Sequence, residues 1–212
     1  MMRLDHVSYA AGPEGLTDTV ARVADALGIE RVKGGIHPRF GTRNAIFPLA
    51  NRQYLEVVEV LDHPASEKAA FGQAVRARSE MGGGWMGWVV SVPNIAPFEE
   101  RLQRSAVQGS RRFPDGRQLE WVQIGIRGLI ADPQLPYFLE WKSDESLRPS
   151  ALSGDVSLKA IQISGSAERL SEWLGLEVGE EIDDVDLELV SPHGMPGINH
   201  VTFDTPHGEV TI

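Results

Sequence analysis

The sequence predicts an α+β protein built from repeated β-α-β-β-β units, and three observations lead to this prediction. Strand-like segments with alternating apolar and polar residues recur along the chain. An amphipathic helical segment follows the first strand of each set. The same order of elements then occurs a second time, and an internal repeat of this kind sets the architecture of a whole chain.

The first unit is predicted to span residues 1–60. Its opening strand, Leu4–Tyr9, alternates apolar and polar side chains. A helix follows, with apolar residues at spacings of four, three and four from Leu16 to Leu27, and Gly28 is suited to end it. Strand-like runs come next at about 30–35, 42–49 and 53–60, with turns predicted at Gly34-Gly35 and Asn51-Arg52.

Residues 61–84 are predicted to connect this unit to the next. Asp62-His63-Pro64 interrupts the preceding strand, Ser66 is a candidate helix cap, and Gly82-Gly83-Gly84 is predicted to be a flexible hinge. The Gly triplet lacks the Lys-Ser/Thr sequence that follows the glycines of a phosphate-binding loop. We therefore expect a structural connector here.

Residues 85–142 repeat the order of elements. A strand at 85–92 precedes a helix that Asn94 can cap, and strands follow near 110–113, 119–126 and 136–142. A turn is predicted at Pro114-Asp115-Gly116.

Residues 143–154 are predicted to be a linker, and 155–212 a partial third unit that opens with the strand-like run Leu158–Ile163. In this part, 180–186 is predicted to form an exposed acidic hairpin. His200 follows a strand pattern like that of the first strand, and is either a ligand-like opening residue or a simple strand histidine.

Charge and composition narrow the function. The net charge is −10, of which residues 1–142 contribute +1 and residues 143–212 contribute −11. An acidic chain repels phosphate backbones, so we expect no nucleic-acid partner. No apolar run is long enough to cross a membrane, no apolar leader is recognisable, and there is no cysteine, so a cytoplasmic protein without disulfides is expected.

Three segments resemble a known family. Leu4-Asp5-His6-Val7, the stretch Gly35–Asn44, and Tyr54-Leu55-Glu56-Val57 are similar to the glyoxalase-like domains of the vicinal oxygen chelate superfamily. The resemblance covers about residues 1–142. It implies a cupped mixed sheet with helices on its outer face and a small-molecule ligand inside the cup.

The resemblance also implies a candidate metal centre. In metal-dependent members each unit supplies one ligand from its first strand and one from its last, which here matches His6, Glu56, Gly87 and Glu140. His6, Glu56 and Glu140 would hold a divalent metal such as Zn, Ni, Fe or Mn. Gly87 has no donor, which departs from glyoxalase I. In the alternative interpretation, His6 is a hydrogen-bonded cup residue and both glutamates are paired or protonated.

Strand alternation leads to the same glutamates without the family. Leu55 and Val57 are predicted to face the helix, so Glu56 faces the concavity. By the same alternation Glu140 faces the cup while its apolar neighbours pack inward. A charged residue among apolar strand neighbours needs a partner or a ligand, so both glutamates are catalytic candidates.

The loop that enters the third strand carries many donors and acceptors. It is predicted to recognise a polar or anionic substrate, with Arg39 or Arg43 gripping a carboxylate. Alternatively it is a polar turn whose side chains satisfy backbone groups. The predicted substrate-binding residues are His37, Arg39, Thr42, Arg43, Asn44, Tyr54 and Trp85.

Three functions follow from these observations. The first is a metal-assisted lyase or isomerase that acts on a small oxygenated metabolite such as an α-hydroxy carbonyl compound, with a carboxylate outside the metal shell as the base. The second is a non-catalytic binder without metal, similar to the drug-sequestering members of the superfamily. The third is a lyase or isomerase that uses acid–base chemistry alone. A monomer and a homodimer are both compatible with the sequence.

Overall fold

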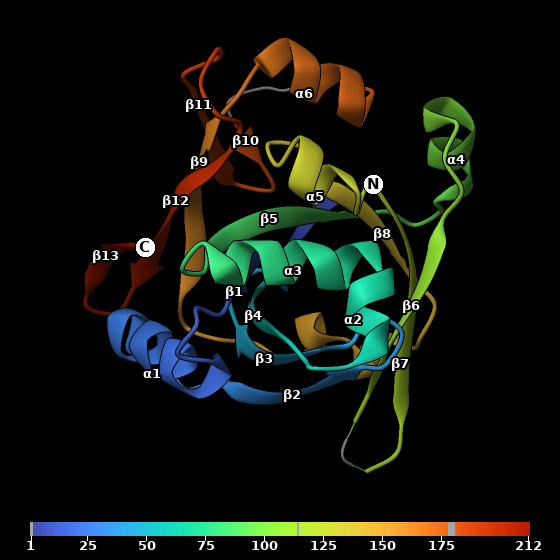
Figure 1. The fold of residues 1–212 in the computed structure, drawn as a ribbon. Coiled ribbons are helices and arrows are strands. Elements are labelled where there is room, and N and C mark those ends of the chain that lie inside the picture. The colour runs from blue at the N-terminus through green and yellow to red at the C-terminus, as the bar shows by residue number, and fades with distance from the viewer. Residues whose placement is uncertain (1, 114, 178–180) are drawn as a thin grey trace.

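The computed structural model describes residues 2–113, 115–177 and 181–212. In this part of the chain a closed barrel of eight strands lies beside a separate sheet of five strands, and helices cover both (Figure 1). The predicted α+β class is confirmed. No helix in the described ranges has the length and apolar character needed to cross a membrane.

The first half of the barrel contains β1 (Arg3–Ala10), α1 (Leu16–Leu27), β2 (Val32–His37), β3 (Thr42–Pro48) and β4 (Tyr54–Val60). Strand β1 pairs in parallel with β4, and β3 lies antiparallel between β4 and β2. This arrangement returns the last strand of the unit to the side of the first.

The prediction of a turn at Gly34-Gly35 is wrong, because both glycines lie inside β2. A Cβ atom on Gly34 would lie 2.2 Å from the backbone oxygen of Asn44, and one on Gly35 would lie 2.4 Å from that of Arg112. These glycines therefore permit close contact between neighbouring strands. The chain turns instead between β2 and β3, where Gly41 has φ +63°.

The connector forms α2 (Pro64–Lys68) and α3 (Ala70–Glu80), and α3 passes across the front of the barrel in Figure 1. His63 caps α2, because its Nδ1 accepts from the backbone N–H of Ala65 at 3.1 Å. The predicted capping of the helix that carries Phe71 by Ser66 is wrong, because that helix is α3, which begins after Ala69, and Ser66 lies within α2. Ser66 instead donates to the carbonyl oxygens of Leu61 and His63. Gly82, Gly83 and Gly84 all have positive φ.

The second half contains β5 (Gly84–Ser91), α4 (Ala96–Leu102), β6 (Val107–Arg112), β7 (Gln118–Ile124), α5 (Gly128–Ala131) and β8 (Tyr137–Trp141), followed by the short helices η1 (Glu145–Leu147) and η2 (Pro149–Ala151). Strand β5 pairs with β8 in parallel and with β1 antiparallel. A single residue pair, Ile36 with Arg112, joins β2 to β6 and closes the barrel. Pro114, in the predicted turn, lies outside the described residues, and Gly116 N–H donates to the carbonyl of Phe113 at 3.0 Å.

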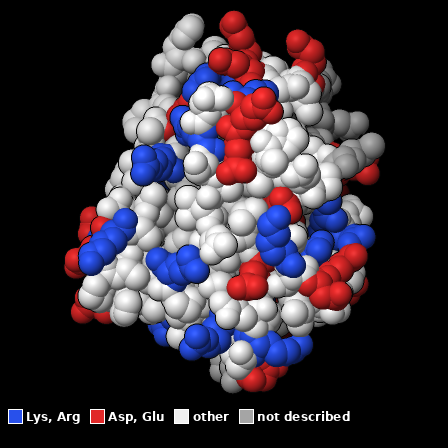
Figure 2. Space-filling model, turned by 90° about the vertical axis from the view of Figure 1, so that its right-hand side faces the viewer, with Lys and Arg blue, Asp and Glu red and all other residues white. Residues whose placement is uncertain are grey.

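The C-terminal part contains β9 (Ser157–Ser164), α6 (Ala167–Leu174), β10 (Glu181–Ile182), β11 (Val185–Val190), β12 (Gly197–Thr205) and β13 (Gly208–Thr211), in the sheet order β10-β11-β9-β12-β13. The predicted acidic hairpin corresponds to β10 and β11, except for Glu180, which lies outside the described residues. On the face shown in Figure 2, Lys and Arg side chains lie among Asp and Glu side chains rather than in one continuous patch.

Strand β12 repeats β1. Residues 198–203 read Ile-Asn-His-Val-Thr-Phe, where residues 4–9 read Leu-Asp-His-Val-Ser-Tyr. Both strands change register with their antiparallel neighbour at the same two places, just before the histidine and just before the final aromatic residue. His200 thus holds the position in β12 that His6 holds in β1, on a partly exposed sheet face.

Two apolar clusters stabilise the fold. One lies inside the barrel and includes Val58, Phe71 and Leu139. The other lies between the barrel wall and the outer elements, where Trp88 of β5 packs with residues of α1, α6 and the C-terminal sheet. Burial of each large apolar side chain contributes about 1.5–3 kcal/mol, so the outer cluster firmly attaches the second sheet to the barrel.

Candidate functional site

The barrel encloses a cavity of about 30 Å3, which is room for one or two water molecules. Aromatic and aliphatic side chains form much of its wall, including Phe40, Phe71 and Trp121. Polar side chains from the first half of the barrel reach it, namely His6, His37, Asn44, Tyr54 and Glu56. The second half contributes Arg111, Gln123 and Tyr137.

A bulge in β1 builds the first polar group. The register shift between Leu4 and His6 places Asp5 on the inner side together with His6. Asp5 Oδ1 lies 2.8 Å from Nδ1 of His6, and Asp5 Oδ2 accepts from Nε1 of Trp141 at 3.0 Å. Burial raises the pKa of Asp5, but the hydrogen bonds with His6 and Trp141 outweigh it and hold the pKa below its usual range. Alternation alone would have placed Asp5 outside, so the sequence offered no signal for it.

His6 is therefore held in one orientation. Nδ1 carries a proton that Asp5 accepts, and Nε2 lies 3.3 Å from the hydroxyl oxygen of Tyr137. The ring also stacks on Tyr54, with centroids 4.3 Å apart. Burial raises the pKa values of Tyr54 and Tyr137 well above the usual range, and the nearby carboxylates add to this effect.

Glu56 reaches the cavity from β4, as strand alternation indicates, and is 5% exposed. One carboxylate oxygen accepts from the Ser8 hydroxyl at 3.0 Å, and the other accepts from Nδ2 of Asn44 at 2.7 Å. Nε2 of His37 lies 3.9 Å from the same oxygen that Asn44 contacts. Two side-chain donors thus hold a buried carboxylate in a fixed position facing the cavity.

The loop and strand after β2 hold this carboxylate in place. Asn44 bridges Glu56 to the backbone, because its Oδ1 accepts from the N–H of Gly35 at 2.9 Å. The hydroxyl oxygen of Thr42 lies 3.0 Å from Nδ1 of His37. The pKa of His37 is lowered to about 4, mainly by burial; the charge of Glu56 opposes this change, and Arg111 and His6 add to it. His37 is therefore a neutral ring at pH 7.

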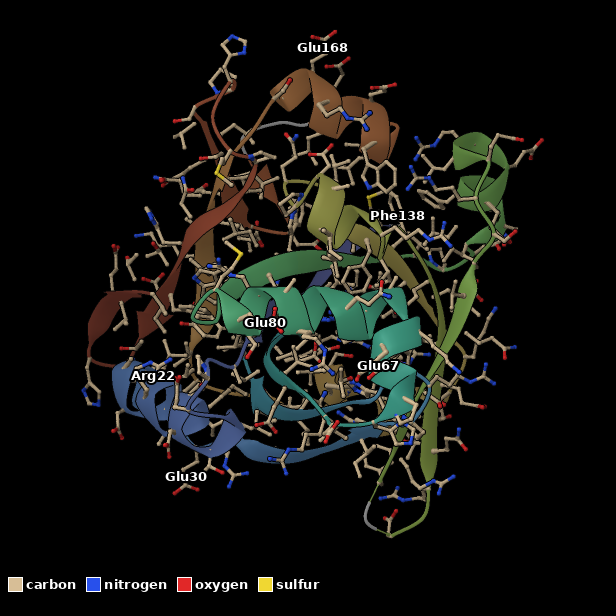
Figure 3. The ribbon with its side chains drawn as sticks, in the orientation of Figure 1. Arg22, Glu30, Glu67, Glu80, Phe138 and Glu168 are labelled. Atoms are coloured by element: carbon tan, nitrogen blue, oxygen red, sulfur yellow. The ribbon has the colours of Figure 1, made fainter. Side chains whose placement is uncertain are left out.

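The prediction that Glu140 faces the cup is wrong. Its carboxylate accepts from the backbone N–H of Ile95 at 2.9 Å, at the start of α4, and forms an ion pair with Lys142. Leu139 and Trp141 line the cavity instead. Phe138, labelled in Figure 3, lies on the side of β8 that carries Glu140 and packs against Phe98 of α4 at 4.4 Å between ring centroids.

The pairing register explains this error. Ser8 pairs with Glu56 in the first half of the barrel, and Val89 pairs with Tyr137 in the second. The residue that matches Glu56 is therefore Tyr137, which is 50 residues after Gly87 just as Glu56 is 50 residues after His6. An odd shift of three residues along a strand reverses the face of the sheet.

Glu140 instead corresponds to Glu59. Each lies 53 residues after its reference position, Gly87 or His6. Glu59 accepts from the backbone N–H of Leu16 at 3.0 Å, at the start of α1, and forms an ion pair with Arg43. Both glutamates thus satisfy the free N–H groups at the start of their unit's helix.

The donor set does not fit the implied metal centre. The four family positions hold His6, Glu56, Gly87 and Tyr137, and a Cβ atom on Gly87 would lie 2.5 Å from Cδ2 of Leu129. Leucine therefore fills the space where a third ligand would stand. Among the described residues, no group of three His, Asp or Glu side chains is placed to hold a metal ion. A catalytic zinc-like site needs about three protein ligands, which this arrangement does not supply.

Three predicted substrate-binding residues lie elsewhere. Arg39 is exposed, and Arg43 points away from the cavity to Glu59. Trp85 donates to the carbonyl of Ile212 at 2.7 Å and packs on Phe203 of the C-terminal sheet. A bulge in β5, opposite Ser8 and Tyr9 of β1, makes Met86 an extra residue, so Trp85 does not share the face of Gly87.

Arg111, like Gln123 and Tyr137, is a cavity residue that the sequence analysis did not predict. It lies near the end of β6, is 5% exposed, and its guanidinium carbon lies 4.7 Å from the centre of the Phe113 ring. Burial lowers the pKa of Arg111, while Tyr54 and Glu56 oppose this. The pair Arg111-Arg112 ends a short strand, where alternation places one of the two arginines inside, and this is the signal that could have identified it.

Comparisons with known proteins agree with this class of fold. The model of the glyoxalase-like domain family matches residues 4–177. A hypothetical protein from Staphylococcus aureus is similar in structure, with a TM-score of 0.64, 15% identity, and coverage of 100% of this chain and 84% of the other. No curated protein matches.

Methylmalonyl-CoA epimerases are more distant. The epimerase from Mycobacterium tuberculosis has a TM-score of 0.45 and 18% identity, over 68% of this chain and 90% of its own. A variant of the Streptomyces coelicolor enzyme, in complex with 2-nitronate-propionyl-CoA, has a TM-score of 0.45 and 16% identity, over 66% and 98%.

The barrel of paired β-α-β-β-β halves defines a protein of the vicinal oxygen chelate class. Within it, the chain belongs to the glyoxalase-like domain family, and the predicted resemblance is confirmed.

Proposed function

We propose that this protein is a lyase or isomerase that binds a small oxygenated metabolite in the barrel cavity and moves a proton on it by acid–base chemistry. The observation that carries this proposal is Glu56, a buried carboxylate held by Ser8 and Asn44 and facing an otherwise largely aromatic cavity. Such a fixed carboxylate is suited to serve as a general base.

The reaction needs a base and a group that stabilises the developing oxyanion. Glu56 takes a proton from the carbon next to a carbonyl, and the electron pair of that C–H bond moves onto the carbonyl oxygen. The hydroxyl of Tyr54, which lines the cavity and whose ring stacks on His6, donates a hydrogen bond to this oxygen. Return of the proton to either face or to a neighbouring carbon completes an isomerisation.

The size of the cavity sets a condition on binding. A volume of about 30 Å3 is smaller than a three-carbon metabolite, so aromatic side chains on the wall must move when a ligand enters. Phe71 of α3 is the wall residue on the connector between the two halves. We therefore expect ligand entry to involve this connector.

The test is solvent proton exchange. Purified protein in D2O is incubated with a panel of α-hydroxy aldehydes, ketones and acids, and loss of the α-proton is followed by NMR. Glu56→Gln is expected to lower the rate by at least about 100-fold, because a positioned base contributes about 100- to 10,000-fold. Glu140→Gln is the matched control and is expected to exchange at the rate of the unaltered protein.

Two results would contradict the proposal. One is no exchange with any compound of the panel, and the other is full exchange by Glu56→Gln. The metal content of protein soaked in Ni, Co, Mn and Zn salts provides a further check. If the unaltered protein binds a stoichiometric metal ion and His6→Ala does not, a metal-assisted reaction would be favoured over acid–base chemistry alone.

A non-catalytic binder is the second candidate, because Phe40, Phe71, Trp121 and Trp141 give the cavity an aromatic wall. A thermal-shift screen separates the two. Stabilisation by a hydrophobic antibiotic-like compound and none by small hydroxy acids would favour the binder.

A further inference from the structure

The cavity wall contains a buried cation that the protein itself does not neutralise. Arg111 is 5% exposed, and its Nε atom is buried with no hydrogen-bond partner. Within the described residues its guanidinium takes part in no ion pair of 4 Å or less. An arginine remains charged in proteins, and a buried charge without a partner is costly, so buried arginines are normally paired.

The nearest candidate partner is already engaged elsewhere. Glu56 influences Arg111 electrostatically, but its two oxygens accept from Ser8 and Asn44, and Nε2 of His37 lies 3.9 Å from one of them. The Phe113 ring lies under the guanidinium and supplies stacking rather than an anion. The donors of Arg111 thus remain available on the cavity side.

The surrounding strands are shaped to hold this arginine. A Cβ atom on Gly35 of β2 would lie 2.9 Å from Cγ of Arg111, so the neighbouring strand has a glycine where the side chain passes. Arg112, the next residue, is exposed and its backbone forms the pair with Ile36 that closes the barrel. The fold therefore places Arg111 inside and Arg112 outside at the same strand end.

We infer that the ligand of this cavity carries a carboxylate and that Arg111 binds it. The inference rests on the proposed function and names its substrate class, a small carboxylic acid oxygenated at the neighbouring carbon. The planar guanidinium fork matches the two oxygens of a carboxylate. A phosphate dianion would bring two negative charges close to Glu56, where a carboxylate brings one, and only one arginine is present to balance them. In this inference Arg111, rather than the predicted Arg39 or Arg43, binds the carboxylate.

Binding of matched acids and amides tests the inference. Lactate, glycerate and pyruvate are titrated against lactamide, glyceramide and pyruvamide by calorimetry, with inorganic phosphate as a further probe. We expect the unaltered protein to bind the acids at least about 10-fold more tightly than the amides, because a charge-assisted pair in a buried site is strong. Arg111→Met is expected to lose this preference, and Arg112→Met, the matched control, to keep it.

A structural role for Arg111 would give a different pattern. Because Arg111→Met removes an unpaired buried charge, its melting temperature is expected to equal or exceed that of the unaltered protein. Arg111→Lys keeps the charge without the fork and is expected to bind the acids several-fold more weakly. Failure of Arg111→Met to fold, together with full acid binding by Arg111→Lys, would overturn the inference.

The remaining outcomes separate the inference from the proposed function. Equal binding of acids and amides, or tighter binding of phosphate than of the acids, overturns the carboxylate class. Exchange of neutral hydroxy ketones at the same rate in Arg111→Met and the unaltered protein also overturns it, and leaves the proposed function standing. Acid binding that depends on Arg111, without proton exchange on any compound, supports the inference and overturns the proposed reaction.

Discussion

Inside the barrel, each polar side chain has its behaviour set by immediate neighbours. His6 is aligned by Asp5 and Tyr137, whereas His37 has the Thr42 hydroxyl and a largely aromatic surround. The two histidines therefore differ in kind, although both are buried in the same cavity. Burial makes the charged form of His37 costly, and the Glu56 carboxylate at 3.9 Å offsets only part of this cost.

His37 is expected to make stability depend on pH. Its pKa of about 4 in the folded protein lies below the usual 6.5, so between these values the unfolded chain binds more protons. Folding stability is then expected to fall as the pH is lowered from about 6.5 to about 4, by roughly 3 kcal/mol from this residue. Urea denaturation across this pH range, in the unaltered protein and in His37→Gln, measures the difference.

The comparison requires a control for other titrating groups. His207→Gln removes an exposed histidine and is expected to keep the pH dependence of the unaltered protein. A His37→Gln variant whose stability declines as steeply as that of the unaltered protein would show that folding does not lower the pKa of His37.

At the scale of strands and helices, bulges and glutamate caps decide which side chains face the cavity. A bulge in β1 turns Asp5 inward, and a bulge in β5 turns Trp85 outward. Glu59 and Glu140, at matching positions of β4 and β8, hold the first turns of α1 and α4. Their negative charge also suits the positive end of a helix.

Glu140→Ala is expected to lower stability by about 1 kcal/mol, because the backbone N–H of Ile95 loses its acceptor. Proton exchange on substrate is expected to stay unchanged. Thermal denaturation and the exchange assay measure the two effects. Glu120→Ala, an exposed position on the neighbouring strand, serves as the control. A large loss of exchange activity with unchanged stability would show that Glu140 takes part in the reaction.

At the scale of the whole molecule, the acidic C-terminal sheet is part of the folded body of the barrel. Phe203 of β12 is fully buried and its ring centroid lies 6.3 Å from that of Trp85 in β5. On the other side, Trp173 of α6 stacks on Phe138 of β8 at 5.9 Å. The two sheets therefore share one apolar cluster.

Phe203→Ala is expected to destabilise the protein by about 3–5 kcal/mol, because it leaves a cavity between the two sheets. Loss of tryptophan fluorescence and of circular dichroism are expected to coincide in urea, as one cooperative transition. Val210→Ala, at a half-buried site of the same sheet, is expected to cost less. Two separate transitions would show that the C-terminal sheet folds independently.

The sequence predicted which strand side chains face the cavity only where apolar and polar residues alternate without interruption. Glu56 lies in β4, which has no bulge, and its inward position follows from Leu55 and Val57. Asp5 and Trp85 lie at or beside bulges. The sequence contains no pattern that predicts these bulges, so the positions of both side chains could not be predicted. Glu140 was misplaced because two glutamates in β4 are three residues apart, and alignment alone does not say which of them it matches.

The sequence by itself determined the α+β class and the family, because repeated local patterns of strand and helix depend on neighbouring residues along the chain. The tertiary structure alone decided the composition of the cavity. It placed Leu129 where a metal ligand would stand and brought the unpaired Arg111 beside Glu56, since such contacts depend on the register between strands distant in sequence.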